Sequence, residues 1–104
     1  MEIHWKDERL RHRVLMYAKS NEITARRMQS ILAARDFRDL VLPSNGRAHF
    51  LKGNLRLFFS IDLERKGNGK RLICSPIGNF QIKDGQFVKE SIHEFEVIKV
   101  EDTH

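Results

Sequence analysis

The sequence predicts an α+β domain in which two N-terminal helices pack on a mainly antiparallel sheet of about four strands. Segments with apolar residues at helical spacing occupy most of the first 40 residues, and segments with alternating apolar and polar residues follow them. The turn-forming run from Pro43 to Gly46 separates the two halves. Helices followed by strands along a chain are typical of the α+β class.

The helical half opens with a short candidate strand at residues 2–5. Acidic residues then precede apolar residues spaced by three and four, which predicts a helix of about three turns over residues 7–18. Ser20 or Asn21 can cap a second helix, which the apolar spacing extends to Phe37. The residues of this helix expected in the core are Met28, Ile31 and Leu32.

Strands are predicted after the turn. Residues 48–51 form a brief strand, and residues 55–63 form the clearest one because their apolar side chains alternate. The residues expected on one face of this strand are Leu57, Phe59, Ile61 and Leu63. A glycine-bearing loop, a returning strand at 71–75, a hairpin or irregular excursion around 80–88 and a last strand at 95–100 complete the sheet.

Length and composition exclude several classes of protein. The 104 residues suffice for one domain, spanning 1–104, and are too few for a multidomain enzyme. Apolar residues make up 40% of the chain, but no apolar run approaches the roughly 20 residues that cross a bilayer. No secretion signal is recognisable, so we expect a cytoplasmic protein without membrane contact. The single cysteine, Cys74, forms no intramolecular disulfide and no closed zinc site, and we expect no metal or cofactor.

The positive charge is concentrated in the first half of the chain. The formal net charge is +5, and residues 1–56 carry 12 basic and 6 acidic side chains, whereas residues 57–104 carry 7 and 8. Such an excess favours nucleic acid or another phosphate-rich partner, because neutralising phosphates releases counterions. The alternative is a basic surface that serves only solubility.

The densest group of potential phosphate ligands lies just after the turn, in residues 47–56. These ligands are Arg47, His49, Lys52 and Arg56. In an extended chain His49 and Lys52 point to opposite faces. Lys70 and Arg71 follow the expected hairpin loop and can return further positive charge to the same surface. The alternative is that all of these are solvated strand and loop charges.

The C-terminal run adds an acid, Asp102, and an imidazole, His104. Metal-free RNA cleavage needs a base for the 2′-hydroxyl, an acid for the leaving 5′-oxygen and cations for the charge that builds on phosphorus. These two residues meet that need together with His49, Lys52 and Arg71 if the sheet brings the strand of His49 to the last strand. The alternative is a frayed, solvated chain end.

The order of these motifs resembles the HigB branch of the RelE/ParE superfamily, the toxins of bacterial toxin–antitoxin pairs. That branch typically carries an R-x-H-x-L-K-G-[DN] stretch, a strand of the W/F-S-[IV] type, a strand with a basic residue before its apolar run, and a chain end close to D-Y-H. The matching residues are Arg47, His49, Leu51, Lys52, Gly53 and Asn54, then Phe59-Ser60-Ile61, Arg71-Leu72-Ile73 and Asp102-Thr103-His104. Together these matches extend over roughly half of the chain.

The resemblance implies a RelE-like fold and a metal-independent endoribonuclease that cleaves messenger RNA on the ribosome and stops translation. It implies proton transfer by His49 and His104, with Asp102 assisting and Arg71 stabilising charge at the phosphate. The residues implied for RNA or phosphate binding are Arg47, Lys52, Arg56 and Lys70. The implied partners are the ribosome and a helix-turn-helix antitoxin of the HigA type.

Two other functions are left open, and one departure from the pattern supports the second of them. Thr103 stands where the branch has tyrosine, which removes a ring that can stack on a base, a contact worth roughly 1–3 kcal/mol. One alternative is a ParE-like toxin that inhibits DNA gyrase without catalysis, for which an acid–base pair has no use. The other is an inactive basic module that binds RNA or the antitoxin.

Overall fold

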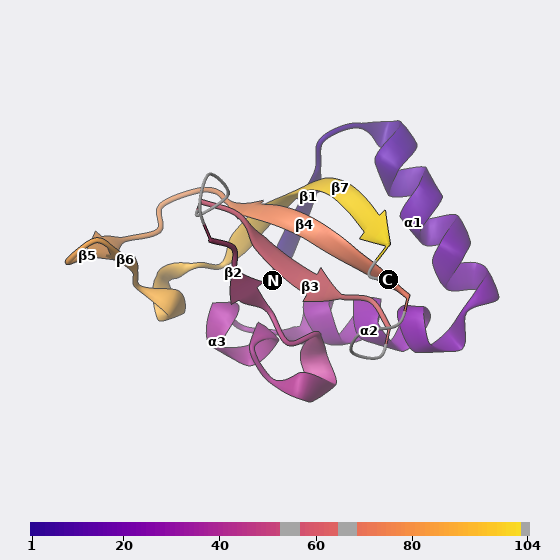
Figure 1. The fold of residues 1–104 in the computed structure, drawn as a ribbon, viewed down its shortest axis with the longest axis horizontal. Helices are drawn as coiled ribbons and strands as arrows, with labels where there is room; N and C mark the ends of the chain where they lie inside the picture. Colours follow the sequence, from indigo (N-terminus) through magenta and orange to yellow (C-terminus); the bar gives the residue numbers. More distant parts are fainter. Residues whose placement is uncertain (53–56, 65–68, 103–104) are drawn as a thin grey trace.

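The computed structural model describes residues 1–52, 57–64 and 69–102, and it confirms the predicted α+β class (Figure 1). Its helices are α1 (Glu8–Ser20), α2 (Glu22–Ala33) and α3 (Phe37–Leu40), with 3₁₀ turns η1 (Pro43–Asn45) and η3 (Lys89–Ser91). Its strands are β1 (Glu2–Trp5), β2 (His49–Phe50), β3 (Phe59–Asp62), β4 (Lys70–Pro76), β5 (Ile82–Lys83), β6 (Gln86–Phe87) and β7 (Glu94–Asp102). Among the described residues, no helix has the length and apolar character needed to cross a membrane.

Side-chain caps determine where the two long helices begin. The carboxylate of Asp7 accepts a hydrogen bond from the backbone N–H of Leu10 at 2.8 Å, and α1 starts directly after it. The side chain of Asn21 accepts one from the N–H of Thr24 at 3.0 Å, and α2 starts there. Both starting points agree with the prediction from the sequence.

The end of the second helix differs from the prediction. The apolar spacing extends it to Phe37, but α2 ends at Ala33 because Ala34 is extended, with ψ of 143°. Asp36 then caps the separate helix α3 by accepting from the N–H of Arg38 at 2.9 Å. The expectation that Leu32 is a core residue is also wrong, since it is 58% exposed.

Five strands, rather than about four, form the main sheet, in the order β1-β7-β4-β3-β2. The first strand pairs in parallel with β7, and all other pairs are antiparallel. Strand β2 lies at one edge, so β4 and β3 stand between it and the last strand. The condition set for the catalytic group, that the sheet brings the strand of His49 to the last strand, is therefore not met.

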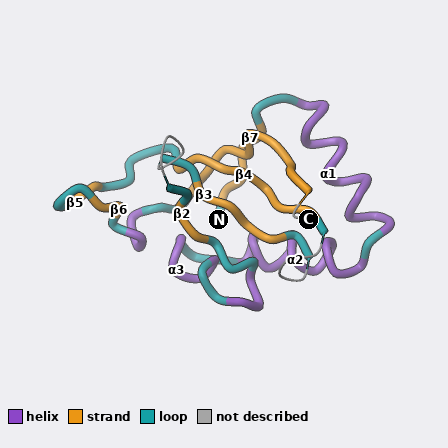
Figure 2. Tube along the Cα trace, viewed as in Figure 1, coloured by secondary structure: helices purple, strands orange, loops and turns teal. Residues whose placement is uncertain are grey.

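A small hairpin, β5–β6, stands away from the main sheet at the opposite end from α1 (Figures 1 and 2). Asp84 and Gly85 connect its strands with φ of 54° and 76°, and two positive φ angles are what a two-residue hairpin turn requires. Phe87 stacks on Phe50 with ring centroids 4.5 Å apart, and Phe50 stacks on Phe37 at 4.7 Å. These rings join the hairpin to the core.

The sheet has one face in the core and one polar face. Phe59 and Ile61 of β3 are fully buried in a cluster with Val14, Ile31 and other residues of the helices. Strand residues alternate between the faces, so the side chains between them project away from the helices. We call this side, which carries His49, Ser60, Asp62, Arg71, Lys99 and Glu101, the polar face.

A β-bulge places the last residues of β7 on these faces. Ile73 is opposite Lys99 and Cys74 is opposite Val97, so Ile98 has no counterpart on β4. Val97 is buried in the core, and without the extra residue position 99 would follow it there. The bulge therefore turns Lys99 to the polar face. Cys74 is fully buried, and burial raises its pKa well above the usual value.

Candidate nucleic-acid interface

A row of side chains crosses the polar face. His49 of β2 lies opposite Ser60 of β3. Ser60 in turn lies opposite Ile73 of β4, which lies opposite Lys99 of β7. Directly opposed residues of antiparallel strands project from the same face. The imidazole and the ammonium group therefore share one surface, with two strands between them.

The imidazole of His49 is held at both of its nitrogens. Nδ1 lies 3.1 Å from the carbonyl oxygen of Arg47, and Nε2 lies 3.3 Å from the hydroxyl of Ser60. A carbonyl can only accept, so Nδ1 carries the proton, and the lone pair of Nε2 then accepts the hydrogen bond of the Ser60 hydroxyl. His49 is exposed while Ser60 is fully buried. This arrangement gives an accessible imidazole the tautomer that a general base needs.

Two cations share one carboxylate beside this row. Arg71 Nη2 lies 2.9 Å from Oε1 of Glu101, and Lys99 Nζ lies 2.9 Å from Oε2. The hydrogen bonds from Lys99 and Arg71 lower the pKa of Glu101, so it is ionised at neutral pH. Arg71, Lys99 and Glu101 together therefore carry one net positive charge. Ion pairs this exposed stabilise the fold by about 0–1 kcal/mol each. A phosphate can therefore replace the carboxylate of Glu101 as the partner of Arg71 or Lys99 with little loss of stability.

Lys70 and Asp102 lie on the other face of the sheet. Lys70 is adjacent to Arg71 in β4, so the two side chains point in opposite directions. Lys70 Nζ is 2.7 Å from Oδ1 of Asp102 and 5.3 Å from the ring centroid of Tyr17 in α1. The expectation that Lys70 and Arg71 serve one surface is therefore wrong for Lys70.

The predicted catalytic residues are only partly brought together. His49 and Asp102 project from opposite faces, and their strands are three strand spacings apart, roughly 14 Å. A direct hydrogen bond between them is excluded by that distance. Arg56 and His104 lie outside the described residues.

Arg47 and Lys52 lie at the two ends of β2. Arg47 is exposed and has φ of 54° directly after Gly46, so the chain turns sharply as it enters the strand. Lys52 is exposed and lines a groove of about 620 Å³ between β2 and the small hairpin. The other lining residues include Phe50, Leu57, Ile82, Phe87 and Lys89. Leu57, expected on one face of the strand at 55–63, precedes β3 and is 58% exposed on this groove.

Part of the basic first half is occupied in structural contacts. Arg26 pairs with Glu22, and the guanidinium of Arg27 donates to the carbonyl of Asp62. Burial lowers the pKa of Arg27, although a guanidinium remains protonated at neutral pH.

Other basic residues extend the positive surface. A shallow groove of about 200 Å³ between the start of α1 and β7 is lined in part by Lys6, Arg9, Arg13 and Lys99. Because Lys99 belongs both to this groove and to the row that begins at His49, the positive surface runs from the polar face onto α1.

Comparison with known proteins adds a structural neighbour. No protein-family model matches the chain, and no curated protein matches its sequence. Among solved structures, the chain is similar to a YoeB/ParE toxin from Agrobacterium tumefaciens, with a TM-score of 0.54 and 12% sequence identity over 100% of both chains. The chain has the fold of this toxin. At that identity the similarity supports the predicted RelE-like architecture and does not distinguish a HigB-type protein.

Three residues of the polar face were not predicted as site residues from the sequence. These are Ser60, Lys99 and Glu101. Ser60 had a signal, because it stands between Phe59 and Ile61 on the opposite face of an alternating strand. Lys99 had none, because its direction depends on the bulge at Ile98.

Proposed function

We propose that this chain is the toxin of a toxin–antitoxin pair and cleaves messenger RNA on the ribosome, as a HigB-type endoribonuclease. The observation that carries the proposal is His49, whose accessible imidazole lies on the same sheet face as Arg71 and Lys99. The fold shared with a YoeB/ParE toxin supports the toxin class. The positive surface that continues onto α1 supports RNA as the ligand.

The proposed reaction is attack of a 2′-oxygen on the adjacent phosphorus. The new 2′-O–P bond forms as the P–O5′ bond breaks, which leaves a 2′,3′-cyclic phosphate and a free 5′-hydroxyl. His49 takes the proton of the 2′-hydroxyl, and His104 gives a proton to the leaving oxygen. Arg71 leaves Glu101 and stabilises the charge on the phosphoryl oxygens. Asp102 assists from the end of β7, and no metal takes part.

The remaining basic residues are proposed to bind the RNA backbone. Lys52 and Arg47 flank His49 along β2 and its turn, and Arg56 follows two residues after Asn54, where the motif ends. Lys70 lies at the start of β4 beside Tyr17 of α1 and would contact RNA that reaches that end of the sheet. The proposed partners are the ribosome and a HigA-like helix-turn-helix antitoxin, which places the protein in the cytoplasm.

The neighbouring toxin's name also includes ParE, so gyrase inhibition is the competing function. To distinguish messenger RNA cleavage from gyrase inhibition, the protein is induced in bacteria without its antitoxin. Incorporation of labelled methionine and thymidine is then followed. The proposal expects methionine incorporation to stop first, and expects the His49→Ala variant to leave it unchanged at equal expression. Early loss of thymidine incorporation with continued translation would assign the chain to gyrase inhibition. Continued growth would support an inactive binding module.

A further inference from the structure

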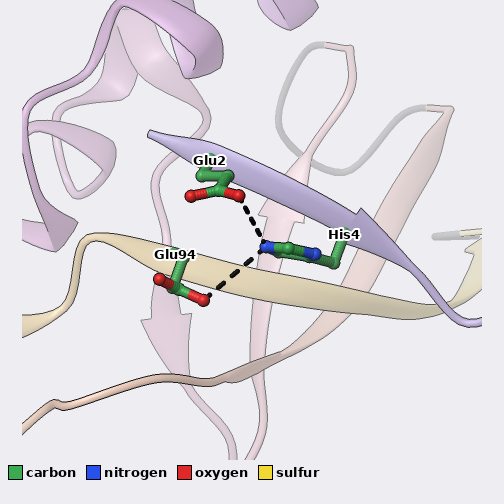
Figure 3. A group of neighbouring side chains, drawn as sticks. All are labelled: Glu2, His4 and Glu94. Atoms are coloured by element: carbon green, nitrogen blue, oxygen red, sulfur yellow. Dashed lines mark ion pairs between the residues drawn. The ribbon is translucent and has the colours of Figure 1, made fainter.

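Two strands that are distant in sequence bring an imidazole and two carboxylates together on the polar face (Figure 3). Glu2 and His4 belong to β1 and are two residues apart, so they project from the same side of that strand. The parallel register places Glu94 of β7 opposite Glu2. Figure 3 shows both carboxylates directed toward the same edge of the imidazole ring.

The spacing of the three side chains fits a bound metal ion. Nε2 of His4 is 3.1 Å from Oε1 of Glu2 and 3.6 Å from Oε1 of Glu94, and all three ligand atoms lie within 4.8 Å of one another. Zinc binds nitrogen and oxygen at about 2.0–2.1 Å, so neighbouring ligand atoms in a tetrahedral site are roughly 3.3 Å apart. The two distances from Nε2 lie on either side of that value.

The imidazole nitrogen in the centre of this group has no hydrogen-bond partner among the residues that the structure describes. Nε2 of His4 is buried, and among the described residues it makes no hydrogen bond, because the two carboxylates approach it at ion-pair distance without hydrogen-bond geometry. The rest of the ring is accessible, with 42% of the side chain exposed. A buried polar atom without a partner costs free energy, which a ligand at that atom would recover.

The backbone next to the group also positions Glu94. Gly78 has φ of +84°, and a Cβ at this position would lie 2.9 Å from Cδ of Glu94. The absence of a side chain at Gly78 therefore lets the carboxyl group rest against the backbone. The N–H of Ile77 donates to the carbonyl of Glu94 at 3.2 Å, which holds the same segment beside β7.

We propose that Glu2, His4 and Glu94 bind a zinc ion. A mixed set of one imidazole and two carboxylates suits zinc, whereas magnesium and calcium prefer sites made of oxygen alone. Glu2 is 66% exposed, so water can complete the coordination.

The zinc site is separate from the proposed RNA-cleaving site. Strand β1 is the opposite edge of the sheet from β2, which carries His49. The ion would link this four-residue edge strand to the start of β7 through its ligands. Zinc would therefore stabilise the fold and take no part in RNA cleavage.

Titration of the full, untagged chain with zinc chloride tests the proposal. We expect one zinc ion per chain and a melting temperature that rises with zinc concentration. The variants His4→Ala and Glu94→Gln should each weaken binding by more than about 10–100-fold, the loss that follows removal of a residue that only supports a ligand. Cobalt, used in place of zinc, should give a visible absorption spectrum that the His4→Ala variant lacks.

Two control variants exclude other sources of binding. His12→Ala removes an exposed histidine of α1, and His104→Ala removes the histidine two residues after Asp102 in sequence. Both should keep the full zinc affinity. Absence of binding at tens of micromolar zinc, or equal affinity in wild type and His4→Ala, would mean that the three side chains form ion pairs only. Loss of binding in His104→Ala alone would place the ion at the chain end and overturn the assignment.

Discussion

The hydroxyl of Ser60 lies 3.3 Å from Nε2 of His49, across the pair of strands β2 and β3. On the other side of the ring, Nδ1 faces the carbonyl oxygen of Arg47 at 3.1 Å. The ring is thereby fixed in one orientation although it is exposed. A base held in this way loses little freedom when RNA binds, which favours proton transfer.

The first prediction concerns this imidazole. His49→Ala should slow single-turnover cleavage on programmed ribosomes by roughly 10²–10⁴-fold, the range of a positioned base, with little change in ribosome binding. Ser60→Ala should have a smaller effect, because it orients the ring without moving protons. Exposed His12 supplies the control, since His12→Ala should cleave at the wild-type rate. Full activity of His49→Ala at an unchanged melting temperature would remove His49 from the mechanism.

The second prediction concerns the cations that share Glu101. Arg71→Ala should lose transition-state stabilisation on the order of 2.7–4 kcal/mol, as removal of one oxyanion donor does, while the fold persists. Lys83→Ala changes an exposed lysine of the small hairpin and should leave cleavage unaltered. If the two variants cleave equally fast, the charge of Arg71 is no more important than that of any surface lysine.

The next prediction is a variant of Glu101 that binds RNA more tightly than the wild type. Its carboxylate binds Arg71 and Lys99 at 2.9 Å each, and so competes with a phosphate for both. Glu101→Gln should therefore tighten RNA binding and steepen its dependence on salt, because one more positive charge becomes available. Filter binding of a short RNA at several salt concentrations measures both quantities. Weaker binding by this variant would show that Glu101 is needed to position the cations.

Much of this architecture could be predicted from the sequence, because it depends on local patterns. The caps at Asp7 and Asn21 and the alternation of Phe59 and Ile61 are visible in single segments. The break before Phe37 was missed because the apolar spacing continues across it, while Asp36 starts a new helix.

The site was less predictable because it depends on how distant segments pair. The strand order separates His49 from the last strand, and no local pattern encodes that order. One extra residue in β7 decides that Lys99, rather than Ile98, faces the polar side. The convergence of His4 with Glu94 likewise follows from a parallel pairing between the two ends of the chain.

The fourth prediction concerns stability and pH. The hydrogen bond from Arg38 lowers the pKa of Asp36, so the ionised carboxylate stabilises the folded state. This stabilisation is fully present above the unfolded-state pKa of about 3.9 and is lost as the pH falls through the lower folded-state pKa. Asp36→Asn keeps a capping side chain but loses the charge. It should be less stable than wild type in urea at pH 7, and the difference should shrink toward pH 3. Asp36→Ala loses the cap as well, at a cost of about 0.5–2 kcal/mol.

A control for this pH dependence is Asp84→Asn in the exposed hairpin turn, where asparagine also tolerates the positive φ. Its stability should follow that of wild type at both pH values. A difference between Asp36→Asn and wild type that persists unchanged at pH 3 would mean that the carboxylate charge does not stabilise α3.

The last prediction is that His49 and His104 act as one proton-transfer unit. An in-line displacement places the attacking and leaving oxygens on opposite sides of phosphorus. Because β3 and β4 separate β2 from β7, the proposal requires the two residues after Asp102 to reach a phosphate bound beside His49 on the polar face. Each alanine variant should slow cleavage by roughly 10²–10⁴-fold. The double variant should be slowed far less than the product of the two single effects, because residues that act as a unit are not additive.

Cleavage should also leave a 2′,3′-cyclic phosphate and persist with a chelator, even where the chelator removes zinc from His4 and lowers the melting temperature. An unchanged rate in His104→Ala would leave protonation of the 5′-oxygen to water held by a cation of the polar face.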